Sequence, residues 1–340
     1  MNMTPIDQTY LIEYLGKPAS IRYFRLGRHA LAVALNAINL PKGSKVLVPS
    51  FICRDLMAAI HQSGCVPIFF EVDHRLDPIA LPDDRDIRVV LAVNYFGFPQ
   101  NINVFVEYCK RIGAVLIEDN AHGFLSEDPS GRLLGSRGDL GIFSMRKTLL
   151  LPGGAALVAN DPKWVDALGN QLSFDQKPLP LAFRLKILLS FLQRILKVNS
   201  LAWGQDIARL ARWVRTGHAI APLPPEDEFN MPDAPHPHVF MLEQHLCSGV
   251  SGEKTRRRDL YDYFQKCLAG YDVRPVFSQL PSGVVPYGFP FYAEESVAKK
   301  IMKISRMHGL DCIRWPDLPS AIAPNAPTHY RTLWMVNFLC

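Results

Sequence analysis

The sequence predicts an α/β protein with a mostly parallel central sheet, helices on both faces of that sheet, and a smaller α/β part near the C-terminal end. Short apolar runs of strand length alternate with stretches of helical periodicity through the first half of the chain, which is typical of βαβ units and a parallel sheet. The 340 residues, 48% hydrophobic and 20% charged, are also enough for one large domain with a smaller one attached.

The expected elements of the first half follow one another in a regular order. Residues 1–20 should form a short helix and a loop, and residues 26–39 have the apolar spacing of a helix. Further strands and helices are expected at 45–49, 52–63, 66–72, 89–96, 102–112, 115–117, 140–143 and 155–159. Because ligands of parallel sheets bind at the carboxyl ends of the strands, side chains that directly follow the strands are the candidate functional residues.

A basic helical insert is expected at about residues 163–230. Within it, residues 179–198 and 201–214 place Leu, Ile, Phe and Trp at helical spacing among arginines and lysines, which is typical of amphipathic helices. One interpretation is that these helices pack over a domain edge or a dimer interface, and the other is that they associate with a membrane surface. Residues 221–237, rich in proline and acids, are the expected linker.

The resulting organisation has three parts. Residues 1–20 are an N-terminal segment, and residues 21–238 are a large domain that contains the insert. Residues 239–340 are a small α/β domain, with helices expected at 254–269 and 294–308 and a strand at 311–315.

Composition argues against several classes of protein. No run of about 20 apolar residues could span a bilayer, and residues 1–17 lack the basic-then-apolar pattern of a signal peptide. The seven cysteines are scattered without a Cys-x-x-Cys pair, which indicates reduced thiols in the cytoplasm and no zinc site. A formal charge of +5 is mild, and it fits an anionic small substrate as well as a solvated surface. We therefore expect small-molecule partners, no nucleic acid and no metal.

The stretch 115–154 carries the pattern that points to chemistry. One predicted buried strand ends just before Asp119, and a second short strand ends just before Ser144. Lys147 is the next lysine, and Gly153-Gly154 opens a further apolar run. An acid at a strand end can keep a pyridine nitrogen protonated, a lysine can form a Schiff base, and a serine can hold phosphate. The stretch therefore predicts a pyridoxal phosphate site.

At these residues the chain resembles the DegT/StrS-type sugar aminotransferases, which have the pyridoxal-phosphate-dependent transferase fold type I of the aspartate aminotransferase superfamily. The matching motifs keep their order over roughly the first half of the chain, which is far less probable by chance than one motif alone. They are Gly27-Arg28-His29-Ala30-Leu31, Val48-Pro49-Ser50-Phe51, Gly64-Cys65-Val66-Pro67, Asn94-Tyr95-Phe96-Gly97, Ile117-Glu118-Asp119-Asn120-Ala121-His122, Gly138-Asp139, Phe143-Ser144, Lys147 and Gly153-Gly154.

The resemblance implies three catalytic residues. Lys147 would hold the cofactor, Asp119 would pair with its ring nitrogen, and His122 would lie near its phenolic oxygen. Arg146 should lower the pKa of Lys147 through like-charge repulsion, as a nucleophilic amine requires. The alternatives are a surface or phosphate-binding lysine, an acid that caps a turn, and a structural histidine.

The resemblance also implies the remaining cofactor contacts. Gly27, Arg28 and His29, at the start of a predicted helix, would bind phosphate together with Ser144, since free amides at a helix start attract anions. Cys53 stands where the family stacks a side chain, often aromatic, on the cofactor ring. Alternatively, Arg28 is a solvated first-turn residue and Cys53 a small core residue.

The implied function is that of a homodimeric aminotransferase that moves an amino group from glutamate to a keto-sugar, carried on a nucleotide, in surface polysaccharide or amino-sugar biosynthesis. Two features depart from the family: the run from Ser144 to Gly154 is shorter, and Pro152 replaces the usual acid. The apolar run 333–340 ends the chain where related chains continue, so a missing terminal segment is a further alternative. A non-catalytic binding protein with the same fold, or a sugar dehydratase that uses the same cofactor, are the competing hypotheses.

Overall fold

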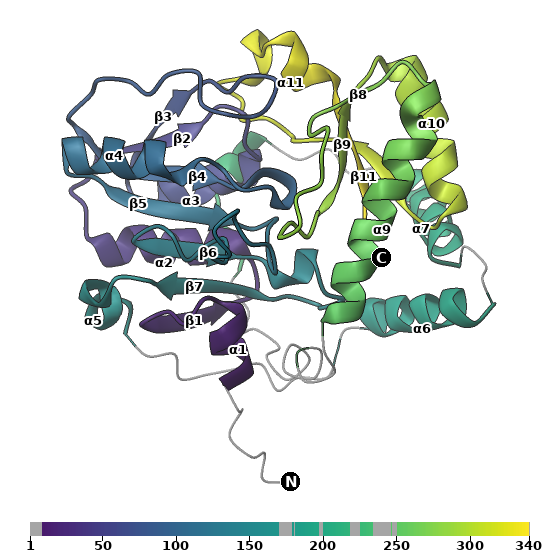
Figure 1. The fold of residues 1–340 in the computed structure, drawn as a ribbon, viewed down its shortest axis with the longest axis horizontal. Coiled ribbons are helices and arrows are strands. Elements are labelled where there is room, and N and C mark those ends of the chain that lie inside the picture. The colour runs from purple at the N-terminus through teal and green to yellow at the C-terminus, as the bar shows by residue number, and fades with distance from the viewer. Residues whose placement is uncertain are drawn as a thin grey trace, which may run out of the picture.

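A seven-stranded sheet forms the centre of the computed structural model, and a four-stranded sheet lies beside it (Figure 1). The structure describes residues 9–169, 179, 181–196, 200–217, 225–233, 246 and 250–339. A single hydrophobic core contains residues of both sheets, for example Leu91 of the large sheet and Phe291 of the small one.

The large sheet has the strand order β1-β7-β6-β5-β4-β2-β3. Its strands are β1 (Ser20–Phe24), β2 (Lys45–Pro49), β3 (Val66–Phe70), β4 (Ile87–Val93), β5 (Val115–Asn120), β6 (Leu140–Phe143) and β7 (Ala155–Ala159). Strands β2 to β6 are parallel, and β7 runs antiparallel to both of its neighbours, β6 and β1. The predicted mostly parallel sheet is therefore confirmed, but the edge strand β1 was not predicted.

Helices cover both faces of this sheet. The helices of this part are α1 (Thr9–Tyr14), α2 (Gly27–Ile38), α3 (Met57–Gln62), α4 (Ile102–Ile112) and α5 (Val165–Leu168). Helices α2 and α3 contact each other on one face, and α4 packs against β4 and β5 on the other (Figure 1). Helix α4 has the predicted bounds and ends at Gly113, whose φ of +74° suits glycine at a helix C-terminus. The sheet is thus buried on both sides, as its continuous apolar strands require.

The second half of the chain forms the small sheet and its helices. The elements are α6 (Leu181–Leu196), α7 (Ser200–Thr216), α9 (Ser251–Cys267), β8 (Arg274–Pro275), β9 (Gly288–Tyr292), α10 (Glu295–Met307), β10 (Asp311–Arg314), α11 (Thr328–Thr332) and β11 (Leu333–Asn337). The small sheet is antiparallel throughout, in the order β10-β11-β9-β8.

Both predicted helices of the insert are present, as α6 and α7, within three residues of the expected bounds. Residues 221–224 and 234–237 of the expected linker, and residues 239–249 of the small domain apart from 246, lie outside the described residues. The domain boundaries therefore remain predictions. No helix in the described part of the chain combines the length and the apolar character needed to cross a bilayer.

A buried ion pair holds the carboxyl end of β5. The side chains of Glu118 and Arg137 are 0% and 2% exposed. Arg137 donates from Nε and Nη2 to Oε1 of Glu118 at 2.8 and 2.6 Å, and its backbone N–H donates to Oε2 at 2.8 Å. Asn94, just after β4, donates to Glu118 and accepts from Arg137. Since successive side chains of a strand point to opposite faces, this pair directs Asp119 to the other face of the sheet.

The first prediction concerns this pair. Replacing Arg137→Met should lower the free energy of unfolding by roughly 3–5 kcal/mol, because Glu118 would keep a buried charge without its partner. Urea denaturation followed by circular dichroism measures the loss. Arg111→Met, which removes an ion pair with Asp83 on the surface, is the matched control and should change stability little. Equal effects of the two substitutions would contradict this interpretation.

Candidate active site

The carboxyl ends of two neighbouring parallel strands bring Asp119 and the Lys147 segment together. In the register of β5 and β6, Asp119 pairs with Ile142, and β6 ends one residue later. Ser144 then leads into a single 3₁₀ turn, Met145–Lys147, which places the lysine just beyond that strand end. The two predicted catalytic groups thus lie at the sheet edge where parallel sheets bind ligands.

The charges of this site influence one another. Burial lowers the pKa of Lys147, and the positive charge of Arg146 lowers it further, whereas Cys53 and Asp119 raise it. Burial raises the pKa of Asp119, although the Ala121 amide, which donates to Oδ1 at 2.9 Å, and the Lys147 charge counteract the rise. The expected effect of Arg146 is present, but burial is the larger cause. Lys147 and Asp119 therefore lie within electrostatic reach of each other.

The ring of His122 is held between two aromatic rings. It stacks on Tyr287 at 4.4 Å between centroids with an interplanar angle of 12°, and on Phe96 at 5.7 Å and 26°. Burial and the Lys147 charge lower the pKa of His122 well below its ordinary value, so the ring is neutral. The Phe96 amide donates to Nδ1 at 3.4 Å, which makes Nδ1 the acceptor and Nε2 the N–H donor of the neutral ring.

Tyr287 is a site residue that sequence analysis did not identify. It precedes β9 in the second half of the chain, and the Nζ of Lys147 lies 5.8 Å from the centroid of its ring. The edge of Trp315, also from the second half, packs against His122 at 5.0 Å. No local motif marks either residue, because each reaches the site only through the docking of the small sheet.

Cys53 and Arg28 lie beside this group. Burial raises the pKa of the Cys53 thiol, with a further rise from Asp55, while the Lys147 and Arg28 charges lower it. The thiol therefore stays protonated and acts as a small apolar wall. The guanidinium of Arg28 forms an ion pair with Asp55, so it is held at the start of α2 rather than solvated.

The start of α2 is open to an anion. Leu26 provides no side-chain cap, so the first amides of the helix, at Gly27 and Arg28, have no capping partner among the described residues. The His29 amide donates to the Leu26 carbonyl at 3.1 Å, and its Nε2 lies 3.0 Å from the carbonyl of Pro232. Both the amide and the Nε2 of His29 thus already contact carbonyls of the protein. We therefore expect Gly27 and Arg28, rather than His29, to contact the phosphate.

Arg146 is a further cationic residue near Arg28. Its Nε is buried without a hydrogen-bond partner among the described residues. Burial lowers the pKa of Arg146, and the nearby positive charges of Arg28 and Arg25 lower it further. A buried donor without a partner costs free energy, so an anion at this point would satisfy it. Ser144, the predicted phosphate ligand, is 2% exposed and directly precedes the turn that contains Arg146.

The short connection after Ser144 keeps the lysine in place. The amide of Lys147 donates to the Ser144 carbonyl at 3.0 Å, and the amide of Arg146 donates to the Gly154 carbonyl at 3.2 Å. Leu149 and Leu151 are buried below this turn. These hydrogen bonds close a compact turn around Lys147, whose charge and that of Asp119 influence each other's pKa.

Arg257 fastens this turn to the second half of the chain. It is fully buried in α9 and donates from Nη2 to the carbonyls of Lys147 and Thr148 at 3.1 and 3.0 Å. Its Nη1 donates to the carbonyls of Pro286 and Tyr287, both at 3.1 Å, and its Nε donates to Glu253 at 2.6 Å. The sequence shows an arginine run at this position, but not which of the three side chains points inward.

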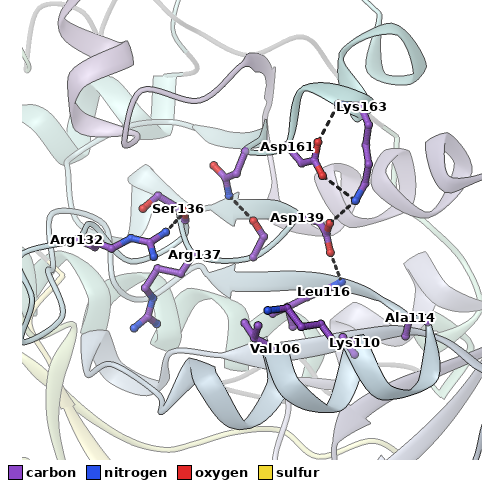
Figure 2. A pocket seen from close by; sticks show the side chains of 14 residues that line it. Val106, Lys110, Ala114, Leu116, Arg132, Ser136, Arg137, Asp139, Asp161 and Lys163 are labelled. Carbon is purple, nitrogen blue, oxygen red and sulfur yellow. Dashed lines mark hydrogen bonds and ion pairs between the residues drawn. The ribbon is translucent and has the colours of Figure 1, made fainter.

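A separate hollow of about 590 Å³ lies at the opposite ends of the central strands (Figure 2). In this hollow Lys163 donates to Asp139 and Asp161, both at 2.7 Å, and Asp139 also accepts from the Leu116 amide. This hollow is at the amino ends of β5 and β6, away from Lys147. In the described part of the chain no cluster of His, Cys, Asp or Glu could hold a metal ion.

Comparison with known proteins supports the resemblance seen in the sequence. A sequence model of the DegT/DnrJ/EryC1/StrS aminotransferase family matches residues 9–173. The dTDP-4-dehydro-2,3,6-trideoxy-D-glucose 4-aminotransferase of Saccharopolyspora spinosa is 30% identical over 174 residues, which cover 48% of this chain and 45% of that protein. The similarity thus spans less than half the length of this curated relative.

Solved structures extend the likeness to nearly the whole chain. The aminotransferase TlmJ from Streptoalloteichus hindustanus matches with a TM-score of 0.66 at 18% identity, covering 98% of this chain and 85% of that one. The E. coli GDP-4-keto-6-deoxy-D-mannose-3-dehydratase with bound hydrated PLP matches with a TM-score of 0.63 at 14% identity, covering 99% and 89%. These likenesses confirm the predicted fold, and residues 9–173 of this chain are similar to the DegT/DnrJ/EryC1/StrS aminotransferase family.

Proposed function

We propose that this chain is a pyridoxal-phosphate-dependent aminotransferase that transfers the amino group of glutamate to a nucleotide-linked keto-sugar. The observation that carries the proposal is the meeting of a buried carboxylate, Asp119, and an amine of lowered pKa, Lys147, at adjoining strand ends. The aminotransferase domain at residues 9–173 and the sugar substrate in the name of the S. spinosa relative support the choice of reaction and substrate class.

The residues present fit the parts of this cofactor. Asp119 suits the ring nitrogen, and the Nε2–H of neutral His122 suits the phenolic oxygen. The unpartnered Nε of Arg146, with Arg28 and the open start of α2 at Gly27, suits the phosphate, and Ser144 lies next to them. When bound, pyridoxal phosphate supplies an electron sink for the pair released when a C–H bond beside the amino group breaks.

Lys147 has two tasks in this mechanism. Its amine would hold the cofactor, and its free Nζ would move the proton at the carbon that bears the amino group. Both tasks need the neutral amine. Because burial and Arg146 lower the pKa of Lys147, a larger share of this amine is neutral at a given pH than in an exposed lysine.

Asp119 would act on the ring nitrogen of the cofactor. Its carboxylate must be ionised to hold a proton on the ring nitrogen, yet burial raises its pKa. The hydrogen bond from Ala121 and the Lys147 charge oppose this rise, and a protonated ring nitrogen would favour the ionised form still more.

Two competing hypotheses, a sugar dehydratase and a non-catalytic binding protein, can be tested against this proposal. The dehydratase hypothesis requires a chain without the lysine, and the binding-protein hypothesis requires that Lys147 does not react.

The second prediction tests the lysine. Purified protein mixed with pyridoxal phosphate should gain an absorbance band near the visible edge, and borohydride should fix the cofactor on Lys147, as mass spectrometry of peptides can show. Lys147→Ala should abolish both signals, because among the lysines that the structure describes we expect only Lys147 to reach the cofactor. Lys163→Ala, which changes a lysine paired with Asp139 at the opposite sheet edge, is the control and should keep both. If Lys147→Ala still forms the reducible product, the assigned lysine is wrong.

The third prediction separates the role of Asp119 from cofactor attachment. Asp119→Asn should keep the borohydride-fixed product but slow amino transfer from glutamate by about 100-fold or more, because a charged group would no longer face the ring nitrogen. Since the Asp119 charge raises the pKa of Lys147, its removal should also shift the pH dependence of cofactor attachment to lower pH. Asp83→Asn, which changes an exposed carboxylate paired with Arg111 on the surface, is the matched control. Attachment without any amino transfer in the unmodified protein would favour the binding-protein hypothesis.

The fourth prediction concerns Arg257. Arg257→Lys keeps the charge but cannot reach four carbonyls at once, so the carbonyls of Lys147 and Thr148 should lose the support of this side chain. Cofactor attachment should slow about 10–100-fold, as expected for misplacing a reacting group by about 1 Å. Arg258→Lys, which holds the carbonyls of Pro281 and Val284 instead, is the control. Equal thermal stability but unequal attachment rates for the two variants would support positioning, and equal attachment rates would refute it.

A further inference from the structure

Exposed apolar side chains are concentrated on α6 and α7. Of the sixteen large hydrophobic residues that are exposed in the described part of the chain, eight lie on these two helices of 16 and 17 residues. Single exposed apolar residues are common on protein surfaces, but such a concentration on one element marks a contact surface. The family match ends at residue 173, before either helix, so this surface is not part of the matched domain.

The exposed residues form a stripe along each helix. On α7, Trp203, Ile207, Leu210 and Val214 follow the spacing i, i+4, i+7 and i+11 and are 61–73% exposed. On α6, the residues at 181, 185 and 188 repeat the same spacing, with leucine at each position. Residues at these spacings lie on one face of a helix, so each helix presents a continuous apolar face to its surroundings.

Other faces of the same helices hold them to the molecule. Arg209 of α7 pairs with Asp311 of β10 at 3.1 Å, and Asp206 of α7 pairs with Arg306 of α10 at 3.2 Å. A side chain at Gly204 would come within 2.7 Å of Leu189, which shows how closely α7 approaches α6. Figure 1 shows the two helices at one side of the molecule, next to the small sheet. The pair is thus anchored, and the apolar stripes are not turned inward.

The charge of the pair is strongly positive. Together the two helices contain six basic residues and one acidic residue, so their formal charge of +5 equals that of the whole chain. Helix α6 contains no acidic residue at all. Among the basic residues, Arg184 of α6 and Arg212 and Arg215 of α7 are exposed. Any partner that covers the stripes must therefore offer negative charge beside apolar surface.

We propose that α6 and α7 together form a docking element for an anionic lipid surface. Leu and Trp side chains would enter the boundary between head groups and acyl chains, while the arginines would contact the lipid phosphates. Helices of 16 and 17 residues are too short to span a bilayer of about 30 Å, so they would lie in its surface. A second copy of the chain is the less suitable partner, because a two-fold contact through this surface would set like charges against each other.

The first experiment uses vesicles and the unmodified chain. The protein should co-sediment with phosphatidylcholine vesicles that contain about one third phosphatidylglycerol, and much less with phosphatidylcholine alone. Raising the ionic strength from about 0.1 M to about 0.5 M should weaken the binding, since salt screens the exposed arginines. Absence of sedimentation with the anionic vesicles at low salt would overturn the proposal.

Variants then test the two parts of the element. Ile207→Ser with Leu210→Ser should remove most of the vesicle binding, whereas Ile79→Ser, equally exposed but in a loop of the large domain, should not. Arg212→Gln with Arg215→Gln should weaken binding about fivefold per arginine, whereas the exposed pair Arg75→Gln and Arg85→Gln should not. Far-UV circular dichroism checks that each variant is folded.

Two results would contradict the proposal at this stage. Equal loss of binding in test and control variants would mean that the vesicles bind the chain without using this surface. A change of oligomeric state in the Ile207→Ser, Leu210→Ser protein, measured by light scattering after size exclusion, would assign the surface to a second copy of the chain. Because none of these residues lies near Lys147, cofactor attachment should be unchanged, and the outcome is independent of the proposed aminotransferase activity.

Discussion

The site depends on how β5 presents two consecutive acids to opposite faces of the sheet. Glu118 points to one face, where Arg137 and Asn94 satisfy its carboxylate inside the protein. Asp119 points to the other face, where one hydrogen bond from Ala121 is its only recorded partner among the described residues. Because side chains alternate along a strand, fixing Glu118 on one face also fixes Asp119 on the other. We infer that the buried pair serves mainly to orient the strand, although removing only one of its partners would leave a costly buried charge.

The second constraint comes from the far half of the chain. The Nε of Arg257 donates to the carboxylate of Glu253. Its Nη2 donates to two backbone carbonyls of the Lys147 turn, and its Nη1 donates to two backbone carbonyls just before β9. One side chain therefore joins the lysine to the ring that lies next to it, Tyr287. This arrangement explains how a turn shorter than that of the family can hold its lysine, because the support comes from α9 rather than from the length of the turn.

Burial is the largest cause of the pKa shifts of four groups of the site. It lowers the pKa of Lys147 and His122 and raises that of Asp119 and Cys53. Each shift favours the neutral form, as expected where water is excluded, and the nearby charges only adjust the result. The helices α6 and α7 follow the opposite principle, since they keep three exposed arginines, Arg184, Arg212 and Arg215, and two apolar stripes at the surface. The chain thus separates a buried reaction site from an exposed charged surface.

The sequence by itself determined the order of strands β2 to β7 and the helices between them, the parallel sheet, and the positions of Asp119, Ser144 and Lys147 at strand ends, because apolar periodicity and strand-end residues are local signals. It also indicated the two amphipathic helices. Only the tertiary structure decided that Tyr287 lies on His122, that Arg257 is the inward arginine of its run, and that the protein's own carbonyls engage His29. Those contacts join residues more than 100 positions apart, and the direction of a side chain across such a distance is set by how the two sheets pack, which no local pattern records.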